Sequence, residues 1–386
     1  MRIAVLGGGP AGLYFSYLWK KRHPQSRIEL YEQNPADATW GFGVVFSERA
    51  LEFLRADDPD TADFIAPYME TWRNMMLDLK GEQVVLDGVG FAAIGRLKLL
   101  QLLQQLARSV GVELTFGKLV ESLAEVGEAD LVVGADGLNS VVRRAFEGDF
   151  KTSLSYADNK FAWYGTTTAF DTLSQTFVET DLGTFNAHHY RYAPDASTFL
   201  VECDRRTWDR YGFAEKTVEE SKAICEKVFA RTLDGHPLIS DRSVWRNFPW
   251  LWNERWHFRN LVLVGDALHT AHFSIGSGTR LAMEDVVSLV KALEAEDDIE
   301  RGLARYEAER RPIVDTLVEA SKTSAEWYEH FPAHMALAPL DFAYSYITRS
   351  GRIDPARLRE MSPGFMARYD AAHPSPSVFR LSEVGR

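Results

Sequence analysis

The sequence predicts an α/β protein: a Rossmann-like dinucleotide-binding domain that carries an inserted, mostly antiparallel β-sheet domain and ends in a helical C-terminus. An apolar run at 2–6 enters a glycine-rich turn that opens a helix, which is the local pattern of a nucleotide-binding strand, loop and helix. Short apolar runs at 131–134 and 261–264 are typical of buried parallel strands. Between them, residues 151–256 change to alternating and β-branched runs, which indicate antiparallel strands.

The elements of the first domain follow in chain order. The strand at 2–6 and its glycine turn lead into a helix that ends near residue 22, and residues 28–32 form the next strand. Leucines spaced three and four residues apart predict an amphipathic helix over 96–110. From residue 280 onward the chain is expected to be helical, and the tail after Gly351 is expected to be irregular because it is rich in proline and charge.

These elements predict one discontinuous nucleotide domain with a second domain threaded through it. Residues 69–90 are expected to add strands to the inserted sheet. The expected boundaries are 1–68, 91–150 and 257–330 for the nucleotide-binding domain, 69–90 and 151–256 for the substrate-binding β domain, and 331–386 for a C-terminal helical or irregular segment.

Length and charge narrow the classes of protein that fit. The 386 residues allow about two to three domains, and 43 basic against 55 acidic residues give a net charge of −12. We therefore expect no nucleic-acid partner, because such binding favours a basic excess. No run approaches the roughly 18 apolar residues of a membrane span, and the first apolar run is too short for a secretory signal, so we expect no membrane association.

The chain has two cysteines, Cys203 and Cys225. Two thiols cannot build a disulfide framework or an all-thiolate zinc site, and we expect no metal. One disulfide between them stays an alternative, but a reducing compartment is the simpler interpretation. We therefore expect a cytoplasmic protein.

The first motif is a glycine-rich turn with the pattern G-x-G-x-x-G, made of Gly7, Gly8, Gly9, Pro10, Ala11 and Gly12. Gly7 is expected to form the tight turn, Gly9 to let the backbone approach a diphosphate, and Gly12 to let helix and strand pack closely. The helix N-terminus then offers free N–H groups to the phosphates. Glu32 lies 20 residues beyond Gly12, where an acid that binds ribose hydroxyls is expected. This motif alone does not distinguish FAD from NAD.

Two later motifs share a Gly-Asp or Asp-Gly turn. Asp136 and Gly137 follow the strand at 131–134, and Asp266 follows the strand at 261–264, just before a glycine-containing loop at 273–279. Each motif alone would be an ordinary turn. In this order after the glycine turn, they make residues 1–330 resemble the flavoprotein aromatic hydroxylases, the single-component FAD monooxygenases typified by para-hydroxybenzoate hydroxylase.

The resemblance implies FAD as the cofactor and NADH or NADPH as a transient reductant. It places Asp136 near both FAD and the reduced nicotinamide, Asp266 on the ribityl chain, and the loop 276–279 beside the pyrimidine edge of the isoalloxazine. Arg96 matches an arginine that contacts the FAD phosphate or ribityl region. The residues implied to bind FAD are Gly7, Gly9, Pro10, Ala11, Gly12, Glu32, Arg96, Asp136, Asp266, Gly276, Gly278 and Thr279.

The loop after Asp266 departs from the family pattern at three positions. The chain has Phe273 where the family usually has proline, Ile275 where it has glycine, and Arg280 where it has asparagine. These changes leave the geometry of the flavin loop open. They also narrow the resemblance to a subgroup.

The subgroup resemblance rests on four strings, at 159–166, 197–203, 245–248 and 272–279. It includes salicylyl-CoA 5-hydroxylase, the monooxygenase half of 2-aminobenzoyl-CoA monooxygenase/reductase, and the tryptophan-hydroxylating enzyme of violacein biosynthesis. It implies hydroxylation of an aromatic ring that bears an amino or hydroxyl group, with NAD(P)H and O2, favouring the 5-position of a salicylyl or anthraniloyl group, free or as a CoA thioester. It does not identify the ring.

Three other functions stay open. An indole or tryptophan ring is one alternative substrate. A non-hydroxylating FAD-dependent reductase or a flavin-binding redox sensor would also need the glycine turn. The string 250–253 superficially matches the W-x-W-x-I-P signature of flavin halogenases, but glutamate and arginine follow it instead of isoleucine and proline.

A substrate site in the inserted domain needs groups that polarise a phenol or aniline and exclude water. The candidates are Trp163, Tyr164, His188, His189 and Tyr190, with His272 beside the flavin loop. The resemblance carries over no general acid or base, so no catalytic residue is assigned. We expect a small aromatic substrate, free, CoA-linked or carrier-bound, and a monomer or homodimer.

Four basic clusters stand out in this acidic chain, at 20–22, 143–144, 205–206 and 310–311. Such clusters usually lie on solvated faces. One of them could instead bind the phosphates of a CoA thioester, because guanidinium groups pair well with phosphate.

Overall fold

The N-terminal strand lies inside a six-stranded, mostly parallel sheet. The computed structural model describes residues 1–39, 41–47 and 50–374. Strand β1 (Arg2–Leu6) pairs in parallel with β2 (Arg27–Tyr31) on one side and β9 (Leu131–Gly134) on the other. The sheet order is β16-β17-β9-β1-β2-β8, completed by β8 (Glu113–Thr115), β16 (His257–Phe258) and β17 (Leu261–Leu263).

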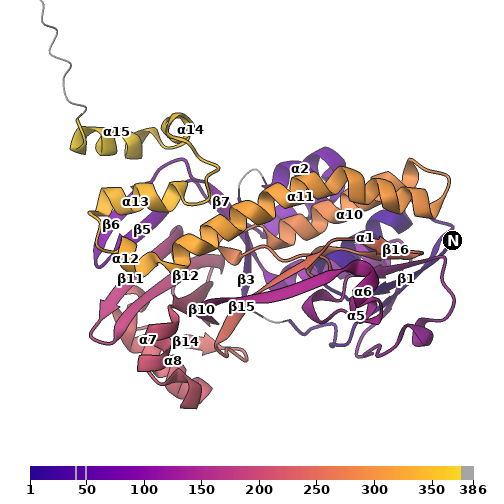
Figure 1. Cartoon of the computed structure of the whole chain (residues 1–386), viewed down its shortest axis with the longest axis horizontal. Helices are drawn as coiled ribbons and strands as arrows, with labels where there is room; N and C mark the ends of the chain where they lie inside the picture. Colours follow the sequence, from indigo (N-terminus) through magenta and orange to yellow (C-terminus); the bar gives the residue numbers. More distant parts are fainter. Residues whose placement is uncertain (40, 48–49, 375–386) are drawn as a thin grey trace, which may run out of the picture.

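Helices cover this sheet because its strands are apolar on both faces, as buried parallel strands are. Helix α1 (Pro10–Arg22) packs between α4 (Arg96–Ser109) and α10 (Gly278–Glu294), and it is buried almost all round. Helix α11 (Ile299–Glu329) packs on α10 and continues past the sheet (Figure 1). In the part of the chain that the structure describes, no helix is both long and apolar enough to cross a membrane.

The second sheet is mostly antiparallel and is built from the middle of the chain. Its order is β14-β10-β13-β12-β11-β5-β6, with β15 paired to β10 and one parallel pair between β5 and β11. Its strands are β5 (Met75–Leu79), β6 (Glu82–Leu86), β10 (Thr152–Thr166), β11 (Leu173–Thr180), β12 (Gly183–Ala193), β13 (Ala196–Cys203), β14 (Leu238–Ser240) and β15 (Arg246–Asn253).

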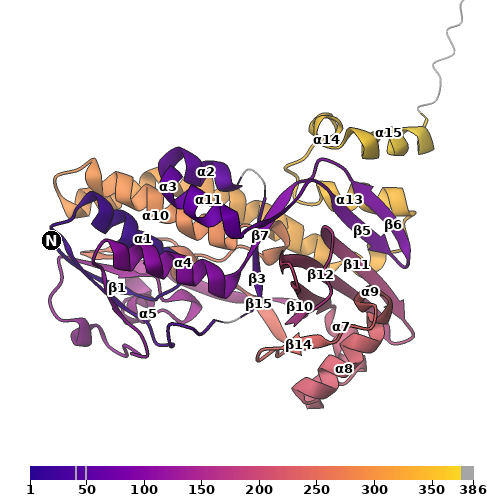
Figure 2. The same ribbon diagram turned by 180° about the vertical axis from the view of Figure 1, so that it is seen from behind.

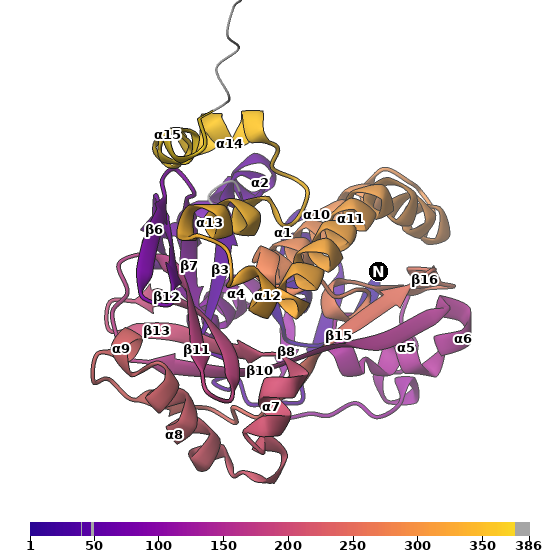
Figure 3. The same cartoon turned by 60° about the vertical axis from the view of Figure 1, so that its left-hand side comes forward.

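Side chains alternate between the two faces of this sheet. One face carries a core with Phe185, Phe199 and the buried free thiols Cys203 and Cys225, and it is covered by α7 (Arg205–Arg210) and α8 (Val218–Val228). The opposite face meets the end of α11 and α13 (Pro339–Thr348), as Figure 3 shows. Neighbouring residues of one strand therefore point into different environments.

The two sheets are joined by elements that run through both parts of the molecule. Strands β10 and β15 pair from Thr152 to Phe161 and lead from the first sheet into the second (Figure 1). A small third sheet, in the order β3-β7-β4, lies between them and consists of β3 (Gly43–Ser47), β4 (Glu70–Trp72) and β7 (Phe91–Gly95).

The remaining elements are short. The helices are α2 (Ala50–Asp57), α3 (Pro59–Ile65), α5 (Val141–Ala145), α6 (Glu147–Phe150), α9 (Ala230–Leu233) and α12 (Phe331–His334). The 3-10 turns are η1 (Ala66–Tyr68), η2 (Leu123–Val126), η3 (Gly137–Asn139), η4 (Phe213–Glu215), η5 (Gly265–Ala267) and η6 (Phe273–Ile275).

The expectation that the tail after Gly351 is irregular is wrong for residues 352–374, the part of the tail that the structure describes. Residues beyond that glycine form α14 (Pro355–Met361) and α15 (Pro363–Ala372), beside α13 at one corner of the molecule (Figure 2). Both helices start at a proline, whose missing N–H costs nothing at the first helical position. Asp354 caps α14 by accepting a hydrogen bond from the Arg357 N–H at 2.8 Å.

The Asp87 carboxylate links helices α14 and α15 to the second sheet through hydrogen bonds. Asp87, just after β6, accepts hydrogen bonds from the Ser362 hydroxyl (3.0 Å) and from the N–H groups of Gly364 (2.8 Å) and Phe365 (2.7 Å). Partial burial alone would raise the pKa of Asp87, but these donors hold it below its ordinary value.

We predict that Asp87→Ala releases α14 and α15, because it removes three hydrogen bonds to one charge, each worth about 1.5 to 3 kcal/mol. Hydrogen exchange should then speed up over residues 355–374 while the first sheet stays protected. In the wild type, the hydrogen bonds of Asp87 to α14 and α15 should also weaken as the pH falls below about 4, where the carboxylate becomes protonated. Asp171→Ala, in an exposed turn, is the control. Equal exchange rates over residues 355–374 in both variants would contradict the role of Asp87 in holding α14 and α15.

Candidate cofactor and substrate site

The glycine turn between β1 and α1 leaves an open space at one position only. A Cβ added to Gly7, which has φ +106°, would lie 2.2 Å from the Ala135 carbonyl oxygen, and one on Gly12 would lie 2.0 Å from the Gly7 oxygen. A Cβ on Gly9 would meet no atom of the described residues within 4 Å. Gly9 therefore borders free space at the start of α1. Helix α1 begins at Pro10, and the N–H groups of its first turn have no partner within the helix.

Glu32 lies beside this turn, at the carboxyl end of β2. Its carboxylate accepts hydrogen bonds from the Gly8 N–H (2.6 Å) and from the Asn34 N–H (2.8 Å). The acid therefore holds the glycine turn in place and remains next to the space at Gly9.

Asp136 ends β9 on the other side of β1. One carboxylate oxygen accepts a hydrogen bond from the Val141 N–H at 2.6 Å, whereas the other, Oδ1, is buried with no partner among the described residues. Burial raises the pKa of Asp136, against the lowering effect of its donors. An orphaned buried acceptor of this kind points to a missing donor at the site.

Asp266 and Arg96 face each other across the same region. The Asp266 side chain is exposed, yet loss of bulk water raises its pKa, with Arg96 as the main opposing charge. Burial likewise lowers the pKa of Arg96, and its Nε has no partner among the described residues. Both side chains thus keep some accessible surface although burial shifts their pKa values, which is the setting of charges that a bound ligand would cover.

The turn that carries Asp266 is held by a buried network that the motifs did not reveal. Asp285 of α10 is fully buried; its carboxylate accepts hydrogen bonds from the Gly265 N–H (3.2 Å) and Arg310 Nε (2.9 Å) and contacts His269 Nε2 at 2.9 Å. Burial alone would raise the pKa of Asp285, but His269 and Arg310 outweigh it and hold it below its ordinary value.

The loop after this turn leads directly to a helix N-terminus. Gly276 takes up a left-handed conformation (φ +59°), and α10 begins two residues later. Within the described residues, a Cβ on Gly278 would meet no atom within 4 Å and Ser277 makes no side-chain cap, so the first N–H groups of α10 have no partner there. Thr279 lies in this first turn. The positive end of a 17-residue helix thus faces open space.

Comparison with known proteins identifies the ligand that this geometry fits. A family model described as an FAD binding domain matches residues 90–321. Salicyloyl-CoA 5-hydroxylase of a Streptomyces species is 38% identical over 399 residues, which cover 99% of this chain and 77% of that protein. The chain belongs to the FAD-dependent aromatic hydroxylases.

Two further relatives and the fold agree with this assignment. 3-Hydroxy-4-methyl-anthranilyl-[aryl-carrier protein] 5-monooxygenase of Streptosporangium sibiricum is 35% identical, over 86% of this chain and 90% of that protein. Protodeoxyviolaceinate monooxygenase of Chromobacterium violaceum is 33% identical, over 92% and 96%. The crystal structure of 2-methyl-3-hydroxypyridine-5-carboxylic acid oxygenase has a TM-score of 0.72 at 18% identity, over 93% of this chain and 96% of that one.

FAD is therefore the cofactor of this hydroxylase, and the cavity suits its parts. Free space at Gly9 suits a diphosphate, and the unpaired acceptor of Asp136 and the desolvated charges of Asp266 and Arg96 suit hydroxyl and phosphate groups. The free end of α10 suits the electron-rich edge of a reduced flavin.

Strand alternation separates the six residues expected in the substrate site. His188 and Tyr190 of β12 point toward the flavin loop and β3: His188 packs 5.3 Å from the Phe273 ring, and the Tyr190 hydroxyl donates to the Gly43 carbonyl at 2.9 Å. His189, between them, points to the other face, where it contacts Thr176 (2.9 Å) and stacks on Phe199.

Strand β10 shows the same separation. Trp163 lies against Gly41 near β3, with its indole N–H unpaired among the described residues. Tyr164 points to the opposite face, into the core around Cys225 of α8. The structure thus brings Trp163, His188 and Tyr190 to the side of the sheet that meets β3 and the loop 273–279, and it places Tyr164 and His189 on the opposite side.

His272 directly precedes the loop 273–279, as the N-cap of η6. Its Nδ1 accepts from the Ser274 N–H (3.3 Å), so its Nε2 carries the proton, and no described residue accepts that proton. The ring packs against Phe273 (4.1 Å) and Phe248 (4.7 Å). Burial lowers the pKa of His272 well below its ordinary value, so the ring is neutral near pH 7.

Glu202 of β13 is a buried acid that the sequence analysis did not single out. Its carboxylate lies 3.3 Å from His188 Nε2 and accepts from the Asn159 side-chain N–H at 2.8 Å, while Gln175 donates to His188 Nδ1 at 2.9 Å. Burial raises the pKa of Glu202 to about 7. The sequence does hold a signal for Glu202, because it is a glutamate inside the apolar string 199–203. An acid at such a buried position is rare unless it is paired, so its presence there indicates a partner.

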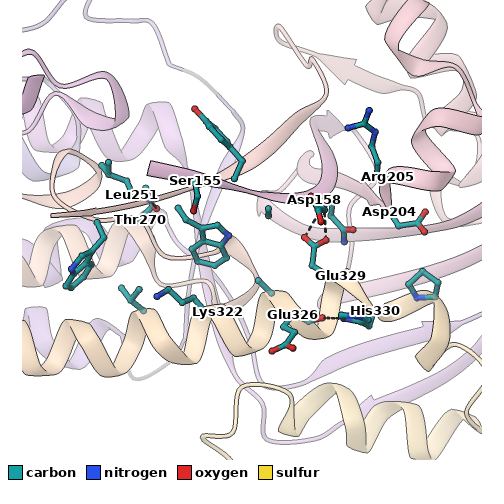
Figure 4. Close-up of a pocket in the computed structure, with 18 of the residues that line it drawn as sticks. Ser155, Asp158, Asp204, Arg205, Leu251, Thr270, Lys322, Glu326, Glu329 and His330 are labelled. Atoms are coloured by element: carbon teal, nitrogen blue, oxygen red, sulfur yellow. Dashed lines mark hydrogen bonds between the residues drawn. The ribbon is translucent and has the colours of Figure 1, made fainter. Parts of the chain in front are cut away.

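A groove of about 890 Å³ lies between helix α11 and strands β10 and β15 (Figure 4). None of the residues assigned to FAD lines it. It is lined by three cations, Arg205, Arg206 and Lys322, together with four acidic residues: Asp158, Asp204, Glu326 and Glu329. The mixed charge does not favour a polyanion.

We predict that Gly9→Ala weakens FAD binding without unfolding the protein. The new Cβ enters free space, and Gly9 has φ −74°, which alanine adopts, so the stability of the FAD-free protein should stay within about 0.5 kcal/mol of the wild type. The dissociation constant for FAD, followed by flavin fluorescence, should rise at least about tenfold. Gly12→Ala, whose Cβ would overlap backbone, should instead fail to fold. Unchanged FAD affinity in Gly9→Ala would refute the placement of the diphosphate.

We predict that Asp285→Asn destabilises the protein by about 1.5 to 3 kcal/mol, because it removes one of the two carboxylates that pair with the buried Arg310 charge and leaves only Glu284. Urea unfolding measures this loss. The pKa of Asp285 is lowered, so its contribution is present at neutral pH and disappears as the pH falls below about 4 in the wild type. Asp315→Asn, exposed on α11, is the control. A stability loss that is the same in both variants would contradict this role.

Proposed function

We propose that this enzyme hydroxylates an aromatic ring of the salicylyl or anthraniloyl type, carried as a CoA or carrier-protein thioester, with the 5-position favoured. Two relatives support a thioester: one is named for a CoA ester and one for an aryl-carrier protein. The observation that carries the proposal is the group of aromatic and polar side chains from β10, β12 and η6 that gathers at the flavin loop. NADH or NADPH would be the transient reductant.

Bound FAD supplies the redox and oxygen chemistry. The chain itself would hold the diphosphate at the start of α1, a ribose at Glu32 and the ribityl chain at Asp266, with Arg96 nearby. Free N–H groups at the start of α10, in the segment Gly276–Thr279, would stabilise negative charge on the pyrimidine edge of the reduced ring.

The substrate ring would lie against the apolar rings of the flavin loop. Phe161 and Phe273 pack 5.0 Å apart, and Phe248 closes the side next to His272, so water has little access. The neutral His272 would donate its Nε2 proton to an oxygen of the substrate, such as the carbonyl of the thioester. His188, held between Gln175 and Glu202, would border the same space with a fixed ring orientation.

One alternative substrate has an observation in its favour. The relative from Chromobacterium violaceum is named for a violacein intermediate, which favours an indole-derived ring. The buried free thiols Cys203 and Cys225 support the proposal of a reducing, cytoplasmic location. A monomer or homodimer stays our prediction for the assembly.

We expect the purified protein to bind FAD and to oxidise NADH or NADPH faster when the right ring is present. The assay compares salicylyl, 2-aminobenzoyl and indole carboxylates, each free and as the CoA thioester, and reads NAD(P)H oxidation together with product mass. One thioester should give a product heavier by one oxygen atom, with consumption of O2. Flavin reduction by NAD(P)H without any oxygenated product would favour a reductase or a redox sensor.

We predict that His188→Gln lowers the yield of hydroxylated product per NAD(P)H oxidised by about tenfold or more, because the ring pocket loses a positioned wall. The matched control is His189→Gln, the next residue on β12, which points to the other face and should leave this yield unchanged. Thermal unfolding of both variants separates folding defects from loss of yield. An equal yield in both variants would refute the proposal that the face of β12 bearing His188 borders the substrate ring.

A further inference from the structure

The four basic clusters of the sequence are largely occupied by contacts within the protein. Lys21 pairs with Asp60 (2.8 Å), Arg205 with Asp209 (3.0 Å) and Arg311 with Glu307 (2.9 Å), while Arg310 is buried on Asp285. In the fourth cluster, at 143–144, the first arginine donates to backbone carbonyls. Within the described residues, each cluster leaves at most one arginine, Arg144 or Arg206, without a side-chain hydrogen bond or ion pair, so none presents several unpaired cations together.

A different cation cluster lies beside the flavin loop. It consists of Arg280 in the first turn of α10, Arg352 in the connection from α13 to α14, and Arg357 in the first turn of α14. Arg280 is one of the three departures from the family pattern. Arg352 and Arg357 follow residue 321, where the match to the FAD binding domain ends.

Arg349 fixes this connection against the flavin loop. Its guanidinium donates to the Ser274 carbonyl at 2.7 Å and to the Ser324 hydroxyl of α11 at 3.0 Å, and it stacks on the Tyr346 ring. Figure 3 shows the connection passing alongside α10 and α11. Arg352 follows three residues later in the same connection, close enough to Arg280 in the first turn of α10 for the two charges to repel each other.

The cluster carries excess positive charge. Within the described residues, no carboxylate pairs with the side chain of Arg352 or Arg357, and both are exposed. Arg280 pairs with Glu284, which also pairs with Arg310. The nearby Asp354 is used to cap α14. Partial burial, and then the charges of Arg280 and Arg357, lower the pKa of Arg352, as expected for like charges held close together.

We propose that Arg280, Arg352 and Arg357 bind the phosphate-bearing tail of a pantetheine thioester whose aromatic ring lies at the flavin loop. The inference rests on the proposed function. Guanidinium groups bind phosphate through paired, charge-assisted hydrogen bonds, which suits them to such a tail. The groove between α11 and strands β10 and β15 has no excess of positive charge, because its cations Arg205, Arg206 and Lys322 lie among four acidic residues. CoA and the phosphopantetheine of a carrier protein share this chemistry.

The first test compares two thioesters of the same acid, 2-aminobenzoyl-CoA and 2-aminobenzoyl-N-acetylcysteamine, which lacks phosphate. In Arg352→Ala and Arg357→Ala, KM for the CoA ester should rise about tenfold, while kcat and the KM of the short thioester stay unchanged. Arg359→Ala is the matched control, because Arg359 is an exposed arginine of α14 that pairs with Asp370. Equal changes for both thioesters, or a higher KM for NADPH instead, would overturn the inference.

The second test needs no turnover. Calorimetry of the FAD-loaded enzyme with CoA, 3′-dephospho-CoA and pantetheine should show binding that weakens as phosphates are removed and that Arg352→Ala reduces about tenfold. Weak CoA binding with tight binding of a phosphopantetheinylated carrier protein, also lost in Arg352→Ala, would identify the carrier as the source. Binding of neither would overturn the inference. Failure of the ring panel alone would refute only the proposed reaction.

Discussion

The carboxylate of Asp285 joins the parts of the molecule on which the cofactor site depends. It is fully buried and meets the Gly265 N–H, His269 and Arg310, so that one charge ties α10, α11 and the Gly-Asp turn together. The turn itself leaves no room: a Cβ on Gly265 would lie 3.0 Å from Ala282 and 3.4 Å from Ala11. The direction of Asp266 into the cavity follows from this packing.

The same packing explains why polar groups remain unpaired in the cavity. Protein interiors normally satisfy buried donors and acceptors, yet Oδ1 of Asp136 and Nε of Arg96 have no partner among the described residues, and Asp266 is accessible but desolvated. If FAD supplies the missing partners, as we propose, the cost of these unpaired groups is offset on binding, and FAD affinity and folding stability become linked quantities.

How far the sequence could predict this site depended on how local each signal was. The glycine turn and Asp266 lie within short motifs, so their spacing alone indicated the cofactor. Asp285 contacts Gly265 from 20 residues away, and Arg349 donates to the Ser274 carbonyl from 75 residues away, which no local pattern records. Alternation along β12 could have separated His188 from His189 in advance. The prolines that suggested an irregular tail are the first residues of two helices.

The central claim is that FAD occupies the cavity between the start of α1 and the start of α10. The most direct measurement is a crystal structure of the FAD-loaded enzyme. We expect the diphosphate at Gly9, the ribityl hydroxyls on Asp266 and the pyrimidine edge against Gly276–Thr279. The Asp285 carboxylate should still accept the hydrogen bond from the Gly265 N–H. A flavin bound elsewhere, for example in the groove behind α11, or an Asp266 that turns away from the cofactor, would contradict it.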